Sequence, residues 1–154
     1  GRPAKRYRRS DKEVPVSLPD RRYDLAGALL ADAVSEAAAT GRPAGAALAE
    51  AARRTGMKVG AATRHEMRGR RSARAVKAAA LATLERFGYE PRAQRGEVVL
   101  FNCPFHALAE RHRDLVCGMN LELLAGLAEG LDEQGRLASR LQPTEGMCCV
   151  RLAL

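Results

Sequence analysis

Four cysteines and two of the three histidines lie in two short pieces near the C-terminal end of the chain. The first piece is NCPFHALAERHRDLVCGMN, residues 102–120, and the second is CCVRL, residues 148–152. Thiolate and imidazole groups are the ligands that zinc prefers, and thiolates also hold iron–sulfur clusters. This collection of side chains therefore indicates a metal or cluster site in the C-terminal part of the protein.

Three cysteines are the main candidates for ligands: Cys103, Cys117 and Cys148. Cys103 and Cys117 lie at the starts of expected helices, where free N–H groups and the helix dipole stabilise a thiolate. Neighbouring residues of a strand point to opposite faces of a sheet, so we expect only one residue of the Cys148–Cys149 pair to face the site. Cys148 is expected to be that residue because it shares its face with Val150 and Leu152. The weaker candidates are Cys149, His106 and His112.

The spacing of the cysteines leaves a second interpretation open. The chain has no C-x2-C pair, and the gaps between the cysteines are longer than those of a zinc motif. Unligated cysteines pack like small hydrophobic side chains, so all four could belong to the core. Because no secretory signal is visible, we expect free thiols in a reducing cytoplasm and not a disulfide framework.

The first half of the chain predicts helices rich in alanine. Hydrophobic spacing predicts a helix over residues 21–39. Pro43 suits the first turn of a second helix, which should run to about residue 54 and be closed by Gly56. Ser72 is a suitable N-cap for a third helix, and Gly88 suits its C-terminal end.

The second half of the chain predicts strands, then helices, then strands. The expected elements are strands at 89–93 and 97–101, helices starting at Pro104 and at Asp114, and strands at 137–141 and 147–154. Cys117 would lie in the first turn of the helix capped by Asp114. We therefore predict an α+β fold, in which N-terminal helices precede a ββααββ unit with a small antiparallel sheet covered by helices. The thiols would meet if the last strand lies beside the strand that ends near residue 102.

Charge and composition narrow the class of protein. The net charge is +8, aromatic residues make up 4% of the chain, and no apolar run approaches the roughly 20 residues of a membrane helix. Residues 1–24 carry a net charge of +4 and residues 64–77 a net charge of +5. Local positive charge favours a polyanion such as DNA, although a solvated surface is the plainer alternative. No oxyanion motif or glycine-rich phosphate loop is present, so we do not expect an enzyme.

The N-terminal residues 1–20 contain three prolines, many charges and no helical period, which indicates an extended linker. The chain begins with Gly and not with Met, and we expect it to be a piece of a longer protein. The weak candidates for contacts with DNA are Arg2, Lys5, Arg6, Arg8 and Arg9.

Three pieces of the chain resemble a known family: GRPAKRYRRS at residues 1–10, NCPFHALAERHRDLVCGMN, and LQPTEGMCCVRL near the C-terminus. They are similar to the C-terminal part of ArsR/DeoR-like winged-helix transcriptional regulators of bacteria, a group that includes the iron–sulfur-sensing SufR repressors. The resemblance implies that residues 1–20 are a linker after a winged-helix domain that is absent from this chain. Residues 21–154 would then be a regulatory and dimerisation domain, helical over 21–88 and cysteine-bearing over 89–154.

The resemblance also implies an Fe–S cluster, with Cys103, Cys117 and Cys148 at positions that match its ligands. SufR repressors carry a further cysteine between the second and the last of these, and residues 118–147 contain none. The candidates for a fourth ligand are His106, His112, Cys149 or a group from outside the protein. Zinc is the alternative to a cluster, and a metal-free domain that binds a small molecule is the alternative to both.

The expected function is therefore that of an effector-sensing, dimerising domain of a cytoplasmic transcriptional regulator with no membrane contact. The resemblance implies a homodimer that meets DNA through the absent upstream domain. Helices at 21–39 and 72–87 would supply much of the dimer interface. Occupancy of the site would change the angle between two DNA-binding domains and thereby their affinity for an operator.

Overall fold

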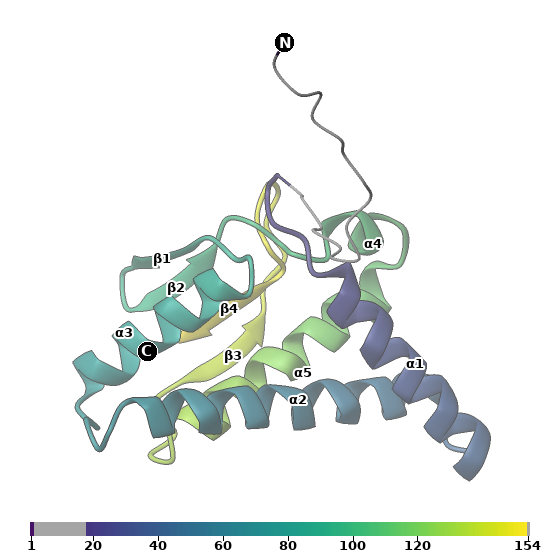
Figure 1. Cartoon of the computed structure of the whole chain (residues 1–154), viewed down its shortest axis with the longest axis horizontal. Coiled ribbons are helices and arrows are strands. Elements are labelled where there is room, and N and C mark those ends of the chain that lie inside the picture. The colour runs from purple at the N-terminus through teal and green to yellow at the C-terminus, as the bar shows by residue number, and fades with distance from the viewer. Residues whose placement is uncertain (2–17, 154) are drawn as a thin grey trace.

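The structure, a computed structural model, describes residue 1 and residues 18–153 and has an α+β fold, as the sequence predicts (Figure 1). Its elements are α1 (Tyr23–Thr40), α2 (Ala44–Glu66), α3 (Ala73–Arg86), β1 (Pro91–Gln94), β2 (Glu97–Leu100), α4 (His106–Arg111), α5 (Arg113–Leu131), β3 (Ala138–Leu141) and β4 (Val150–Ala153). The predicted DNA-contact residues Arg2, Lys5, Arg6, Arg8 and Arg9 lie outside the described residues. Among the described residues, no helix is long and apolar enough to cross a membrane.

The four strands form one antiparallel sheet in the order β1-β2-β4-β3. β1 and β2 form the predicted hairpin, whose turn residues Arg95 and Gly96 both have positive φ, as a tight two-residue turn requires. β2 pairs with β4, with Val98 opposite Leu152. This pairing confirms that the last strand lies beside the strand that leads to the first cysteine.

Helix α5 connects the two halves of the molecule. It packs against β3 and β4 on one side and against α2 along most of its length on the other. Figure 1 shows α2 and α5 side by side below the sheet, with α1 extending from the end of α2 and α3 beside the hairpin. The core residues of the sheet, such as Val98, Leu100 and Leu152, are fully buried in the same cluster as those of α5.

The backbones of α2 and α5 touch at four glycines, two on each helix. A Cβ atom on Gly56 would lie 2.0 Å from the carbonyl oxygen of Leu123, and one on Gly126 would lie 2.1 Å from that of Arg53. No side chain larger than that of glycine fits at these four positions. The prediction that Gly56 closes the second helix is therefore wrong, because the helix continues through Gly56 to Glu66. This glycine allows α5 to pack closely and does not end the helix.

Other predicted boundaries differ by a few residues. α3 begins after Ser72, whose hydroxyl accepts a hydrogen bond from the Ala75 N–H (3.2 Å), as predicted. α4 begins at His106 and not at Pro104, and α5 begins at Arg113, before Asp114. Cys117 therefore lies in the second turn of α5.

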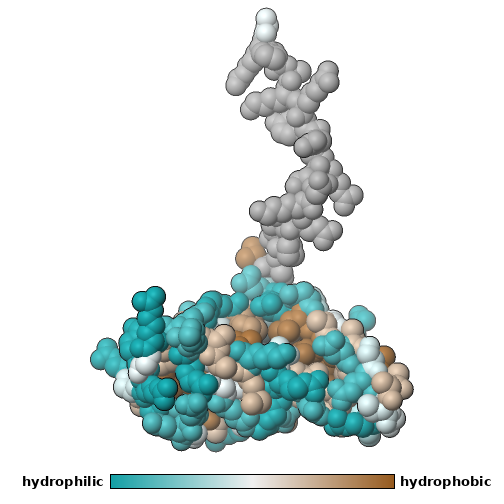
Figure 2. Space-filling model, turned by 60° about the horizontal axis from the view of Figure 1, so that its bottom comes forward, coloured by the Kyte–Doolittle hydropathy of each residue, from teal (hydrophilic) through white to brown (hydrophobic). Residues whose placement is uncertain are grey.

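The surface of the molecule is largely polar. Figure 2 shows one face on which hydrophilic residues predominate and hydrophobic ones occupy small areas between them. Larger apolar side chains that are exposed include Tyr23 and Val34 on α1 and Leu141 at the edge strand β3. Met57 on α2 and Leu115 on α5 are also exposed, so α1 is one of three helices in the described part of the chain with an exposed large apolar side chain.

Candidate functional site

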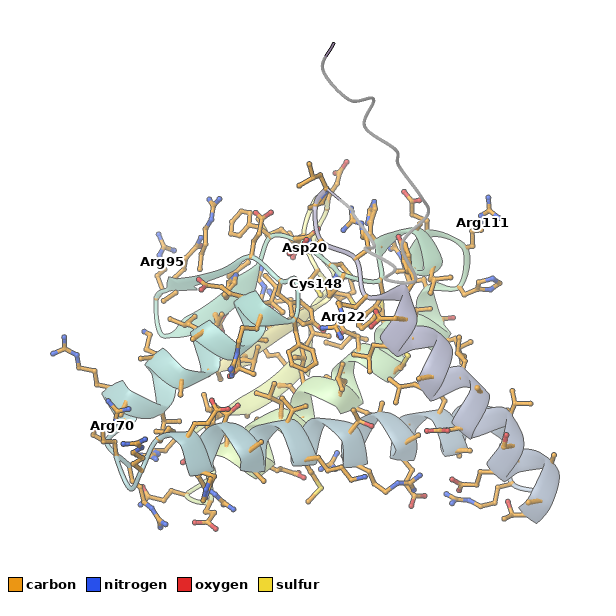
Figure 3. All side chains as sticks on the ribbon, in the orientation of Figure 1. Asp20, Arg22, Arg70, Arg95, Arg111 and Cys148 are labelled. Atoms are coloured by element: carbon orange, nitrogen blue, oxygen red, sulfur yellow. The ribbon has the colours of Figure 1, made fainter. Side chains whose placement is uncertain are left out.

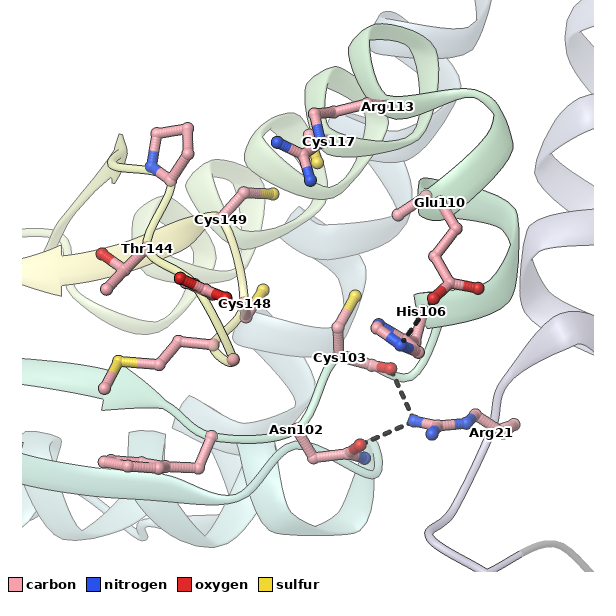
Figure 4. A pocket seen from close by; sticks show the side chains of 16 residues that line it. Arg21, Asn102, Cys103, His106, Glu110, Arg113, Cys117, Thr144, Cys148 and Cys149 are labelled. Atoms are coloured by element: carbon pink, nitrogen blue, oxygen red, sulfur yellow. Dashed lines mark hydrogen bonds and ion pairs between the residues drawn. The ribbon is translucent and has the colours of Figure 1, made fainter.

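The four cysteines lie on the wall of one cavity of about 670 Å³ (Figure 4). They come from three separate segments: Cys103 follows β2, Cys117 lies in α5, and Cys148 and Cys149 precede β4. The structure thus brings together all three main candidates of the sequence analysis and the weaker candidate Cys149. His106 also lines the cavity, with its ring 3.3 Å from the Glu110 carboxylate.

The pairing of β2 with β4 explains how the distant cysteines meet. These strands are antiparallel, so the end of β2 lies beside the start of β4. The Cys148 N–H donates to the carbonyl oxygen of Leu100 at 2.9 Å and extends this ladder by one step. Cys103 follows Leu100 by three residues, and α5 carries Cys117 across the same end of the sheet.

The expectation that only one residue of the Cys148–Cys149 pair faces the site is wrong. β4 begins at Val150, so both cysteines lie in irregular backbone, where the alternation of a strand does not apply. Both are buried and both line the cavity. Cys149 is therefore a fourth thiol at the cavity.

The thiols lie close enough together to shift one another's pKa. The neighbouring Cys148 thiol and burial raise the pKa of Cys103 far above its usual range. For Cys148 the neighbouring Cys103 thiol lowers the pKa, but Cys149 and burial outweigh this effect and raise the pKa to about 12.

Burial also raises the pKa of Cys117, although the neighbouring Cys149 thiol and Arg113 lower it in part. The raised pKa values of Cys103 and Cys117 do not favour the thiolates that were expected at helix starts. Burial and neighbouring thiols outweigh a helix dipole that acts on Cys117 only from the second turn. Metal binding at this site must release protons.

A buried polar pair lies behind Cys148. Asn120 on α5 is 1% exposed, and its Nδ2 donates to the Cys148 sulfur at 3.2 Å. The Tyr89 hydroxyl donates to Asn120 Oδ1. Neither residue was predicted from the sequence, although an Asn three positions after Cys117 on an otherwise apolar helix face was a visible signal.

The segment Asp20–Arg22, just before α1, is hydrogen-bonded to the segment Asn102–Pro104 that contains the first cysteine. The Arg21 guanidinium donates to Asn102 Oδ1 (2.6 Å) and to the Cys103 carbonyl oxygen (2.8 Å). The Arg22 backbone N–H donates to the Pro104 carbonyl oxygen (3.0 Å). The Asn102 side-chain Nδ2 donates to the Asp20 carbonyl oxygen (3.2 Å). Figure 3 shows Asp20 and Arg22 next to Cys148, far from Arg70 at the opposite end of the molecule.

Two of the three histidines do not belong to the site. His112 precedes α5, is exposed and does not line the cavity, so it is not placed as a ligand. His65 lies in the last turn of α2. His106 remains the histidine nearest to the thiols.

The cysteines and His106 at the cavity differ in how well they suit a single metal ion and a cluster. Within residues 18–153, no three Cys, His, Asp or Glu side chains are placed so that they could hold one metal ion. A single zinc ion therefore does not fit this arrangement unless the side chains move. A [4Fe–4S] cluster differs because each cysteine binds its own iron atom, so the sulfurs need not converge on one point. Four thiols around a cavity fit that requirement as a donor set.

Comparisons with protein-family models, with curated proteins and with solved structures find no match for this chain. The resemblance to winged-helix regulators therefore stays a prediction from the residues quoted above.

Proposed function

We propose that this chain is the sensing part of a cytoplasmic transcriptional regulator and that its four cysteines hold an Fe–S cluster. The single observation that carries this proposal is the meeting of four thiols from three separate segments at one cavity. The donor set of a cluster is a group of cysteine thiolates.

The residues of the chain have distinct parts in this proposal. Cys103, Cys117, Cys148 and Cys149 supply sulfur ligands once their protons are lost, and a bound cluster supplies a group whose charge and stability change with oxidation. Arg21 and Arg113 line the same cavity and offset the negative charge of the thiolates.

The Asp20–Arg22 segment gives the site a direct connection to the N-terminal part of the chain. Arg21 holds the carbonyl oxygen of Cys103 itself, so a movement of that cysteine changes the bonds that hold the segment. In the proposed regulator, this segment leads to the DNA-binding domain. The state of the site would then bias the orientation of that domain in a homodimer and its affinity for DNA.

The experiment is to purify the protein without oxygen, record its visible absorption, and measure iron, sulfide and zinc per chain. We expect a brown protein with matched iron and sulfide, and loss of both in the variants Cys103→Ser and Cys148→Ser. His112→Ala is the matched control, since this residue lies outside the cavity, and it should keep the cluster. A colourless protein in which wild type and the cysteine variants are alike would reject the proposal.

A second candidate is a regulatory domain that binds a small molecule without metal. Two observations favour it: the described residues contain no group for a single metal ion, and the cavity has the size of a small-molecule site. Arg21, His106 and Arg113 at the cavity would favour an anionic ligand. A colourless, metal-free protein whose melting temperature is unchanged by Cys103→Ser would support this candidate.

A further inference from the structure

One end of the molecule carries more positive charge than its own acidic residues can offset. Residues 64–77, which comprise the end of α2, the turn that follows it and the start of α3, contain six Arg or Lys residues and one Glu. We call this region the basic turn. Figure 3 shows Arg70 at this end, away from Cys148, and the function proposed for the cysteines makes no use of it.

Few carboxylates offset this charge. Glu133 forms ion pairs with both Arg64 and Arg71, so that one negative charge is shared between two guanidinium groups. Glu66, the one acidic residue of the basic turn, pairs with Arg86 at the end of α3, outside the turn (3.5 Å). An excess of cations therefore remains after these ion pairs form.

The remaining cations lie where they do not stabilise the fold. Arg68, Arg74 and Lys77 form no ion pair with any of residues 18–153. Arg74 lies in the first turn of α3, which contains no acidic residue, and Arg70 and Arg71 come shortly before it. The N-terminal end of a helix carries partial positive charge, which favours anions and not further cations. A negatively charged partner would explain this arrangement, whereas local stability does not.

The arginines of the basic turn border two adjoining hollows of the surface. Arg64 and Arg71 line both hollows, Arg68 lines one of them, and Arg70 lines the other. The Arg70 Nε donates a hydrogen bond to the carbonyl oxygen of Met67 (3.1 Å). This bond orients the guanidinium group and leaves its positive charge available to a partner.

The side chains of the basic turn favour one kind of negatively charged partner. Arginine presents its N–H groups in a plane that matches the oxygens of a phosphate. Residues 64–77, all of which the structure describes, expose no large apolar side chain that could form the core of a protein interface. They also contain no Phe, Tyr or Trp on which unpaired bases could stack. These observations favour the phosphates of a nucleic-acid duplex over an acidic protein or a single strand.

We propose that the basic turn binds the phosphate backbone of a nucleic-acid duplex without reading its base sequence. The inference goes beyond the proposed function and does not depend on it, because no cysteine takes part. The contact would also be separate from any contact made through the Asp20–Arg22 segment, since Figure 3 shows Asp20 and Arg70 at opposite ends of the molecule.

The test measures the fluorescence anisotropy of a labelled DNA duplex mixed with the whole chain over a range of salt concentrations. One variant carries Arg68→Gln and Arg74→Gln together. The matched control carries Arg95→Gln and Arg111→Gln, which removes the same charge from two exposed arginines that also have no ion pair with the described residues. Arg68 and Arg95 share a positive φ (50° and 47°), so each double variant changes one residue of this backbone conformation.

We expect wild type to bind DNA duplexes of unrelated sequence with equal affinity, because all of them carry the same phosphates. The variant with Arg68→Gln and Arg74→Gln should bind at least about tenfold more weakly at low salt, and the slope of log affinity against log salt should become shallower by about 2. The control should lose less than about threefold in affinity and keep its slope. An RNA duplex of the same sequence tells whether the surface accepts either duplex or DNA alone, and either result supports the inference.

Equal losses in the two double variants would overturn the inference, because net charge alone would then explain the binding. A wild type that does not bind the duplex at low salt would overturn it as well. Polyglutamate that binds as tightly as the duplex would assign the surface to an acidic protein instead. Cys148→Ser, which tests the proposed function, should bind the duplex like wild type, so the two proposals can fail separately.

Discussion

At the scale of single residues, the site is built from thiols that are protonated when no ligand is present. Cys103 is partly buried and Cys148 is buried, and both have a raised pKa. A metal centre must therefore displace protons, so its affinity should rise with pH. This property separates a ligand site from a nucleophilic cysteine, which requires a lowered pKa.

The raised pKa values lead to a prediction for the metal-free protein. Because only the thiolate reacts, we expect iodoacetamide at neutral pH to modify Cys148 at least about tenfold more slowly than in the unfolded chain. The rate should keep rising as the pH passes 9.0, the usual pKa, towards about 12. Peptide mass spectrometry of the alkylated protein measures this rate, and a Cys148 that reacts at neutral pH as fast as the unfolded chain would contradict the assignment.

Part of the site can be predicted from residue types, and part cannot. Cys103, Cys117 and Cys148 stand out by type and by the quoted resemblance. The prediction for Cys149 is wrong because its strand starts three residues later than expected, at Val150 and not at Met147. Arg21 reaches the site from 81 residues away along the chain, a contact that only the fold reveals.

At the scale of elements, the contact of α2 with α5 depends on glycines that a sequence reading takes for helix ends. The residues around Gly56 in the sequence do not tell whether this glycine ends a helix or lets a second helix pack against the backbone. Helix α5 decides between the two, because the carbonyl oxygen of Leu123 lies where a side chain on Gly56 would be. The length of α2 could therefore not be predicted locally, whereas the Ser72 cap and the Arg95-Gly96 turn could, since they depend on neighbours in sequence.

A pair of alanine substitutions in α5 tests this helix contact. Gly126→Ala puts a Cβ atom 2.1 Å from the Arg53 carbonyl oxygen, so we expect the free energy of unfolding to fall by about 2–4 kcal/mol. Gly118→Ala, in the same helix, meets no atom within 4 Å and should be neutral or stabilising by up to about 1 kcal/mol. Urea denaturation compares the two; equal effects would mean that the helices are not in backbone contact.

The contact between the Asp20–Arg22 segment and the Asn102–Pro104 segment gives a prediction of local stability. Arg21→Ala removes two hydrogen bonds of a charged donor, so we expect amide exchange at the Arg22 N–H to quicken by about tenfold or more. Arg54→Ala, which removes only exposed ion pairs to Glu36 and Glu50, is the matched control and should leave that amide unchanged. Unchanged exchange in Arg21→Ala would show that this side chain does not hold the segment.

At the scale of the whole molecule, alternating apolar residues and turn signals predicted the fold class correctly. Each strand can be recognised from a few neighbouring residues in the sequence. The turn at Arg95-Gly96 then predicts that β1 and β2 pair antiparallel. The order β1-β2-β4-β3 brings the last strand back beside the second, and this return assembles the cysteines. The pairing of β2 with β4 therefore both completes the sheet and brings the cysteines together.

The proposed homodimer has a candidate surface on α1. Tyr23 and Val34 are 41% and 61% exposed, and a second copy that packs on α1 would bury both side chains. Light scattering should give twice the mass of the chain, and Val34→Lys should shift it towards the monomer. Leu141→Lys, at a position on the sheet edge that is 50% exposed, should leave the mass unchanged. A monomer at high concentration in wild type would contradict the dimer.

Native mass spectrometry of protein purified without oxygen tests the central claim most directly, because it weighs the polypeptide together with whatever it holds. We expect a dimer that carries one iron–sulfur group on each chain, with the added mass absent from the Cys148→Ser variant. A mass equal to that of the bare polypeptide, in protein kept from oxygen and from chelators, would contradict the claim that the four cysteines form one cluster site.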